Sequence, residues 1–189
     1  MTGEEIAVWL SNIYGGAIEL KDIEGVRIAF VTLGDDTRTA TTCGFSQVDT
    51  GLALQDDKST DVRCEIVIQS DSASDEELAA ALIGLWGVLA RAPGTIPAQP
   101  GTSVPNAVVQ SPLAAVPEVT VKHAVLREPQ IFDQGTPSLS EEGRITLLLE
   151  AVLLTDEEFG IVQTQGMDRV STRLRRRATN LGDFRRDAD

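Results

Sequence analysis

Apolar side chains recur every three or four positions in two stretches of the chain, residues 2–14 and residues 74–91. This spacing is typical of amphipathic helices that bury one face. Each stretch begins with Thr or Ser followed three positions later by Glu, the capping-box pattern of a helix start. Gly84 and Gly87 lower the helix propensity of the second stretch by about 1 kcal/mol each. We therefore expect either close packing against a sheet at these glycines or a weak helix.

Other stretches have the composition and spacing of β-strands. Three such runs follow the first helix, separated by short polar links: residues 25–34, 39–48 and 61–70. The third alternates apolar and polar side chains, and links this short favour antiparallel pairing over β–α–β crossovers. Two more runs follow later, at residues 118–127 and 144–154, with turn and loop predicted between them. The last run is apolar at nearly every position, which predicts a strand covered on both faces.

This last strand runs directly into a helix. Thr155 is placed to cap it, and the acids at 156–158 fill its first turn. A negative charge there stabilises the unpaired backbone N–H groups by about 0.3–1 kcal/mol. A helix start therefore explains the three acids, and we do not interpret them as catalytic carboxylates. The helical pattern breaks at Gly166, resumes and then dissolves, so residues 176–189 are predicted to form an Arg-rich, flexible tail.

The middle of the chain bears on the number of domains. Residues 92–117 hold six of the eight prolines and can form neither a regular helix nor a central strand. This segment could link two domains, but neither side of it has a complete sheet of its own. We therefore predict an ordered excursion within a single domain that spans residues 1–175. The fold class is α+β, with a central, mostly antiparallel or mixed sheet and helices packed on it.

Charge is distributed unevenly along the 189 residues. The net charge is −13, with +3 on residues 166–189 and −16 on the rest. An acidic body repels phosphate groups, which disfavours nucleic acid as a partner. The same charge favours a basic protein partner through electrostatic steering, although plain solubility explains it equally well.

Hydropathy and the N-terminus bear on location. Hydrophobic residues make up 42% of the chain, and no apolar run reaches the roughly 18 residues of a membrane span. The acidic N-terminal stretch lacks the basic and apolar regions of a secretory signal. We therefore expect a cytoplasmic protein that does not associate with membranes.

Candidate chemistry is sparse. The only histidine, His123, falls on the apolar face of its run, where a satisfied structural histidine is the simplest interpretation. Cys43 and Cys64 lie in strand-like runs and are expected to be reduced thiols in the core, although a pair across a hairpin is an alternative. No glycine-rich phosphate loop or metal-ligand spacing is present, so we predict no catalytic residue, cofactor or metal. The Arg cluster at 173–177 is interpreted as a solvated helix end.

Four stretches resemble the suppressor-of-fused domain family in its bacterial form: TTCGFS (41–46), DVRCEIVIQ (61–69), residues 81–97 and residues 145–174. The last contains the junction of Thr and three acids between the closing strand and helix. The resemblance covers roughly residues 25–175 and rests on pattern more than on a sharp signature. It implies a mixed α+β domain without enzymatic chemistry. It also implies a role as a cytosolic binding protein, and many bacterial members look like immunity proteins that neutralise a toxin domain.

The function suggested by these features is protein binding, in an immunity-type or another regulatory role, by a monomer or weak dimer. Two alternatives remain: a secretion-type chaperone that binds an effector segment, and a hydrolase that uses His123, Cys43 or Cys64. The sequence does not identify the partner-binding residues. Candidate interfaces are the 92–117 segment, an exposed sheet edge, and the acidic loops around Asp35, Asp36, Asp56 and Asp57.

Overall fold

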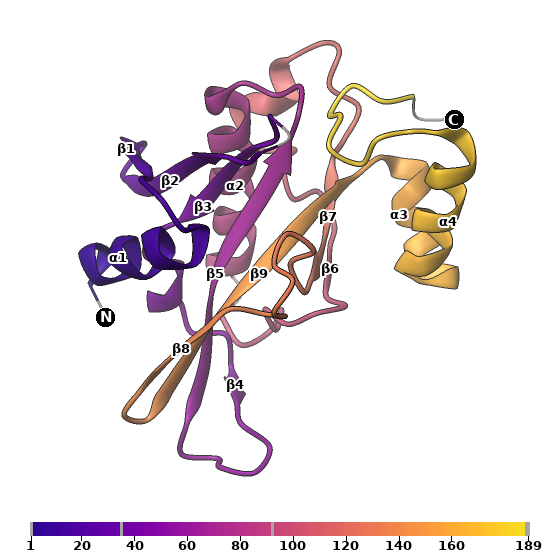
Figure 1. Cartoon of the computed structure of the whole chain (residues 1–189). Helices are drawn as coiled ribbons and strands as arrows, with labels where there is room; N and C mark the ends of the chain where they lie inside the picture. Colours follow the sequence, from indigo (N-terminus) through magenta and orange to yellow (C-terminus); the bar gives the residue numbers. More distant parts are fainter. Residues whose placement is uncertain (1, 35, 92, 188–189) are drawn as a thin grey trace.

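A single mixed sheet runs through the molecule, with helices on both of its faces (Figure 1). The structure is a computed structural model that describes residues 2–34, 36–91 and 93–187. In chain order the elements are α1 (Gly3–Tyr14), β1 (Glu19–Ile23), β2 (Val26–Thr32), β3 (Arg38–Thr42), the 3₁₀ turn η1 (Phe45–Gln47), β4 (Leu52–Ala53), β5 (Asp61–Ser70), α2 (Asp75–Arg91), β6 (Ser103–Val104), the 3₁₀ turn η2 (Pro112–Ala115), β7 (His123–Arg127), β8 (Ser138–Glu141), β9 (Arg144–Leu154), α3 (Asp156–Gln165) and α4 (Met167–Arg177).

The strands lie in the order β1-β2-β3-β5-β9-β7-β6, with β4 added to β5 and β8 added to β9. The long strands β5 and β9 are parallel neighbours at the centre, and the other strand pairs of the described residues are antiparallel. Because helices and loops cover both faces, β9 is buried along nearly its whole length, as its apolar sequence predicts. The expected α+β fold, one domain with a mostly antiparallel, mixed sheet, is confirmed.

The helices divide between the two faces of the sheet. Leu78, Leu82 and Leu85 of α2 share a core cluster with inward-facing side chains of β5. On the opposite face, α1 packs on Val67 and Leu148. The α3–α4 pair covers the far end of the same face, over Val152 and Leu154 of β9. Within the described ranges, no helix is both long and apolar enough to cross a membrane.

The predicted helix starts are confirmed because their signals are local. Thr2 and Glu5 form a capping box at α1, and Thr155 and Glu158 form one at α3. At α2, the backbone N–H of Glu77 donates to the Ser74 hydroxyl, and a Glu77 carboxylate oxygen accepts from the backbone N–H of Ser74. The junction after β9 is thus an architectural one, in which side chains satisfy the backbone at the start of a helix.

Several strand boundaries differ from the sequence prediction. The run at 39–48 leaves the sheet after Thr42, where Gly44 adopts a φ of 141° and η1 begins. The run at 118–127 forms a strand only from His123. Part of the segment expected to be loop, β8, instead makes a hairpin with β9. At the end of β3 the cause is a distant residue, because the Glu65 carboxylate accepts from the backbone N–H groups of residues 44–46.

The Pro-rich segment is an ordered part of the domain. Val104, Val108 and Leu113 are fully buried in the core cluster on the α2 face. Gly84 lies directly beneath this segment, because a Cβ there would come within 2.8 Å of the carbonyl oxygen of Ala107. The alternative of close packing at Gly84 is therefore correct, but with this segment rather than the expected sheet as the neighbour.

The C-terminal segment differs most from expectation. The chain does not leave the domain at residue 175, because α4 continues to Arg177 and residues 178–187 return to the end of the sheet. Phe184 is 1% exposed within the α2-side core, and Arg186 is 3% exposed. The Ser70 hydroxyl donates to the carbonyl of Gly182 at 2.5 Å. The expected tail at 176–189 is thus part of the domain as far as residue 187, and residues 188 and 189 lie outside the described ranges.

Candidate partner-binding surfaces

The residues considered for catalysis have structural roles, beginning with His123 at the start of β7. Its Nδ1 accepts a hydrogen bond from the backbone N–H of Asn106 at 3.0 Å, and its Nε2 lies 2.9 Å from a carboxylate oxygen of Asp156. The ring stacks on Phe159 with 4.2 Å between centroids. An acceptor at Nδ1 places the ring proton on Nε2, so His123 donates to Asp156. The expected satisfied, structural histidine is confirmed, and it joins the Pro-rich segment to α3.

The two cysteines lie on opposite faces of the sheet. Cys43 packs in the cluster beneath α1, and Cys64 packs in the cluster beneath α2. Both are free thiols, so the expectation of reduced core cysteines is confirmed. Burial raises the pKa of Cys43 to about 12 and also raises the pKa of Cys64. Since the thiolate is the nucleophilic form, neither side chain is prepared for catalysis.

A buried carboxylate organises the turn after β3. Glu65 of β5 is fully buried and accepts hydrogen bonds from the backbone N–H groups of Gly44, Phe45 and Ser46 at 3.0–3.1 Å. The Thr42 hydroxyl donates to the same carboxylate at 2.5 Å. Burial raises the pKa of Glu65, while these donors act in the opposite direction. The carboxylate therefore satisfies the start of η1 from a strand that is distant in sequence.

A second buried carboxylate, Glu150, lies near the middle of β9. It accepts two hydrogen bonds from the guanidinium of Arg127, at 2.6 and 3.0 Å. The Gln69 amide and the backbone N–H of Gln130 complete its partners. Neither Glu65 nor Glu150 was predicted to have a role. For Glu150 the available signal was a single acid within an otherwise apolar strand, because such a group requires partners when it is buried. For Glu65 there was no comparable signal, because its strand alternates apolar and polar residues.

The two ends of the sheet offer little free backbone for a partner strand. β6 has only two residues, and the Pro-rich segment that carries it is held in the core. β1 is longer but carries charged side chains, and its Lys21 Nζ lies 2.8 Å from Asp75 of α2. Charged and short edge strands are common devices against strand addition. The exposed sheet edge is thus the weakest of the predicted interface candidates.

The acidic loops contribute to one end of the molecule. The β4–β5 loop and the β8–β9 turn lie side by side there, because the backbone N–H of Asp61 donates to the carbonyl of Gly143 at 2.9 Å. We call the exposed acids of these two loops the acidic tip: Asp56, Asp57, Glu141 and Glu142. A negatively charged surface of this kind steers basic proteins.

The members of the predicted acidic loops differ in role. The Asp57 carboxylate accepts hydrogen bonds from Ser59 and Thr60, which lower its pKa and hold the loop. Asp56 projects into solvent beside it. In the other predicted acidic loop, Asp36 occupies a turn with a φ of 64°, and Asp35 lies outside the described residues. Asp56 is therefore more available to a partner than Asp57, whose carboxylate is engaged within the loop.

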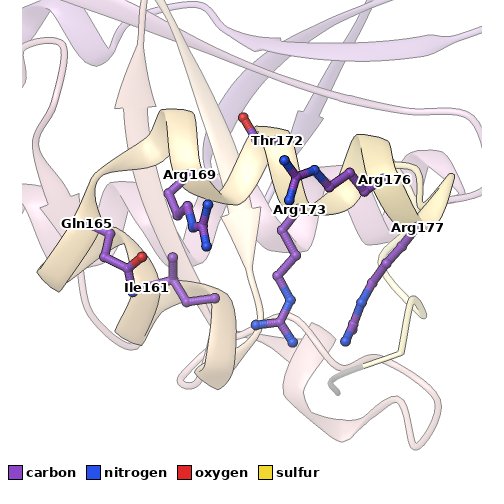
Figure 2. Close-up of a pocket in the computed structure, with 7 residues that line it drawn as sticks. All are labelled: Ile161, Gln165, Arg169, Thr172, Arg173, Arg176 and Arg177. Atoms are coloured by element: carbon purple, nitrogen blue, oxygen red, sulfur yellow. The ribbon is translucent and has the colours of Figure 1, made fainter.

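A basic groove of about 300 Å³ lies on the α3–α4 pair (Figure 2). Its walls come from two residues of α3 and from one threonine and four arginines of α4: Ile161, Gln165, Thr172, Arg169, Arg173, Arg176 and Arg177. The sequence analysis interpreted 173–177 as a solvated helix end. The structure adds Arg169 and a wall from α3, which produce a concave site that spacing within one helix could not reveal.

Comparisons with known proteins agree with this architecture. The family model for the suppressor of fused protein matches residues 21–187. A crystal structure of a suppressor-of-fused homolog from Neisseria gonorrhoeae aligns with a TM-score of 0.61 at 13% identity, covering 98% of this chain and 95% of that one. The crystal structure of the Sufu–Fu complex aligns with a TM-score of 0.63 at 12% identity, covering 96% and 87% respectively. No curated protein sequence matches the chain.

Proposed function

The chain belongs to the suppressor-of-fused family, and we propose that it is a non-enzymatic domain that binds and sequesters one protein partner. The observation that supports this proposal is the similarity of its fold, over 96% of its length, to a protein crystallised as the Sufu–Fu complex. In this chain, the engaged nitrogens of His123 and the raised pKa values of the two thiols also argue against a hydrolase.

The proposed partner is a basic protein. Residues 1–165 carry a net charge of −16, and the acidic tip presents four exposed acids at one end of the sheet. Complementary charge raises the association rate and disfavours acidic competitors. An immunity-type role, in which the partner is a basic toxin domain, and another regulatory role both fit this chemistry. A cytoplasmic protein that is a monomer or a weak dimer belongs to the same proposal, and the two free thiols fit that location.

The test is a pull-down with the tagged full chain from an extract of the source organism, washed in parallel at low salt and at about 1 M salt. We expect a stoichiometric basic protein that is retained at low salt and largely released at about 1 M, where the screening length falls to about 3 Å. Mass spectrometry would identify the partner, and a nuclease or similar toxin would indicate immunity. A bait without any stoichiometric partner at either salt would contradict the proposal.

Variants test whether the acidic tip is the surface involved. The tip variant combines Asp56→Asn, Glu141→Gln and Glu142→Gln, and it keeps Asp57, which holds the loop. A control variant with the same change in charge alters exposed acids elsewhere: Glu118→Gln, Glu128→Gln and Asp133→Asn. We expect the tip variant alone to lose the partner at low salt. Equal losses in both variants would show that net charge, rather than the tip, holds the partner.

A further inference from the structure

The groove between α3 and α4 concentrates positive charge on an acidic protein. Arg169, Arg176 and Arg177 are exposed, and Arg173 is partly buried at the groove wall. Figure 2 shows the side chains of Arg169 and Arg173 extending from α4 toward the α3 side of the groove, where Ile161 and Gln165 lie. Residues 166–189 carry a net charge of +3, against −16 for the remainder. The basic surface is therefore local and its charge is opposite to that of the body.

The helix dipole accounts for only part of this arrangement. Arginines in the last turn of α4 complement the negative end of the dipole. Arg169 lies instead in the first turn, where the dipole disfavours a cation. The pairs Arg169/Arg173 and Arg173/Arg177 also place like charges four positions apart, which destabilises a helix. An arrangement that works against α4 itself is explained if the arginines share an external anion.

The acids near the groove offset only part of its charge. Glu157 lies 2.5 Å from one guanidinium nitrogen of Arg173. Glu157 and Asp187 border a neighbouring depression rather than the groove itself. Among the described residues that line the groove, none is acidic. The net charge of the lining side chains is thus strongly positive.

We propose that this groove binds an extended, acidic segment of a protein, with carboxylates three residues apart. Arg169 and Arg176 are seven positions apart on α4, about 10 Å along the axis at 1.5 Å per residue. Three residues of an extended chain in the polyproline II conformation rise about 9 Å and complete one turn, so both carboxylates lie on the same face. Gln165 and Thr172 supply polar groups for the peptide backbone between the two carboxylates, and Ile161 supplies an apolar contact. The site is separate from the acidic tip and does not depend on the proposed basic partner.

Charge complementarity selects this occupant over other polyanions. A nucleic acid or an anionic membrane extends far beyond the groove, and its further phosphates would meet the acidic body. A short peptide segment places its negative charge only within the groove. Planar guanidinium groups also match carboxylates through paired N–H donors. The groove therefore fits a local acidic segment and disfavours an extended polyanion.

The test measures fluorescence anisotropy of labelled 12-residue Gly/Ser peptides with the full chain at low ionic strength. One peptide carries four Glu at every third position, a second carries the four Glu as one block, and a third carries Lys in place of the spaced Glu. A labelled single-stranded oligonucleotide of similar length is the fourth probe. We expect the spaced acidic peptide to bind most tightly, and this binding to weaken steeply with salt.

Variants on the same helix assign the binding to the groove. The groove variant is Arg169→Gln with Arg176→Gln, and the control is Arg175→Gln, outside the groove lining, with Arg91→Gln on α2. We expect about tenfold weaker binding in the groove variant and less than twofold in the control. The melting temperature of the groove variant should equal or exceed that of the wild type, because a like-charge pair is relieved.

Three results would overturn the inference. The first is no binding of the spaced acidic peptide at low ionic strength. The second is equal weakening in the two variants, which would assign the effect to overall charge. The third is equally tight binding of another acidic probe. If the block peptide bound as tightly as the spaced peptide, the proposed spacing would be wrong, and if the oligonucleotide did so, the proposed class of ligand would be wrong. A failed search for a basic partner would leave each of these measurements unchanged.

Discussion

At the residue scale, Asp75 joins α2 to two strands of the sheet. Its carboxylate accepts two hydrogen bonds from the Arg38 guanidinium, at 2.7 and 2.9 Å, and one from Lys21 Nζ at 2.8 Å. The Arg38 hydrogen bonds, helped by Lys21 and opposed by burial, hold the pKa of Asp75 down to about 2. The ionised carboxylate is thus more stable in the folded chain than in the unfolded one.

We predict that Asp75→Asn lowers the free energy of unfolding by about 1 kcal/mol at pH 7, a value reduced by solvent screening of its partly exposed partners. Because the pKa of Asp75 is lower in the folded chain, its ionised carboxylate stabilises the fold at pH values above the unfolded-state pKa near 4. This contribution disappears as the pH falls toward 2. Urea unfolding at several pH values should show the wild type and the variant converging across this window. Glu76→Gln, in the same helical turn, controls for the loss of a charge near the helix dipole. A stability difference between wild type and Asp75→Asn that stays constant with pH would contradict the role of the ionised carboxylate.

The residue scale also shows where sequence analysis ends. The capping partners of Thr2 and Thr155 were predictable because they lie three positions away. The partners of Asp75 were not, because Arg38 and Lys21 are separated from it by 37 and 54 positions. From the sequence alone, Asp75 is an acid at the start of a helix, where it complements the helix dipole. Long-range pairs of charged residues require the fold before they can be assigned.

At the element scale, α2 depends on a glycine for its contact with the Pro-rich segment. We predict that Gly84→Ala destabilises the protein by about 1–3 kcal/mol, although Ala is the better helix former. The added Cβ would lie 2.8 Å from the carbonyl oxygen of Ala107 and 3.0 Å from Cβ of Ser111, so backbone would have to move. Gly87→Ala is the matched control in the same helix.

The control should have the opposite sign. A Cβ at Gly87 meets only the end of the flexible Arg91 side chain, at 3.9 Å. Gly87→Ala should therefore stabilise the protein, by up to about 1 kcal/mol. Denaturant unfolding of both variants measures the two effects. Stabilisation by both substitutions would show that the Pro-rich segment moves to accommodate the added methyl group at little cost and is not tightly packed against α2.

Elements were predictable wherever one local pattern dominated. The strand at 144–154 and the helix at 74–91 were predicted to within one residue of the observed bounds. The run at 39–48 was not, because the Glu65 carboxylate draws three backbone N–H groups out of the sheet. The basic groove lies between two helices, and the pattern of one helix does not show which helix packs beside it. Its α3 wall could therefore not be predicted from the sequence of α4. Local patterns define elements, and distant partners define their ends and the surfaces between them.

At the scale of the whole molecule, the last residues hold the α3–α4 pair to the sheet. Arg186 donates to both carboxylate oxygens of Glu158, at 2.9 and 2.6 Å, and to the carbonyl of Leu153 on β9 at 2.5 Å. The polar, Arg-rich sequence around Arg186 suggested a flexible tail. Composition alone does not distinguish a solvated arginine from a buried, paired one. The segment also places Phe184 in the core on the other face of the sheet.

We predict that Arg186→Ala destabilises the protein by about 3–5 kcal/mol, because it leaves Glu158 as an unpaired, buried carboxylate. Arg185→Ala is the control, since Arg185 pairs with Glu77 at the surface and should contribute less than about 1 kcal/mol. Replacing both members of the buried pair, by Glu158→Gln and Arg186→Met, should recover part of the loss because no unpaired charge remains. Denaturant unfolding of these variants measures the effects.

Similar losses from Arg186→Ala and Arg185→Ala would mean that the C-terminal segment does not anchor the domain. A larger loss at Arg186 would show that a segment whose sequence resembles a disordered tail anchors α3 to the sheet.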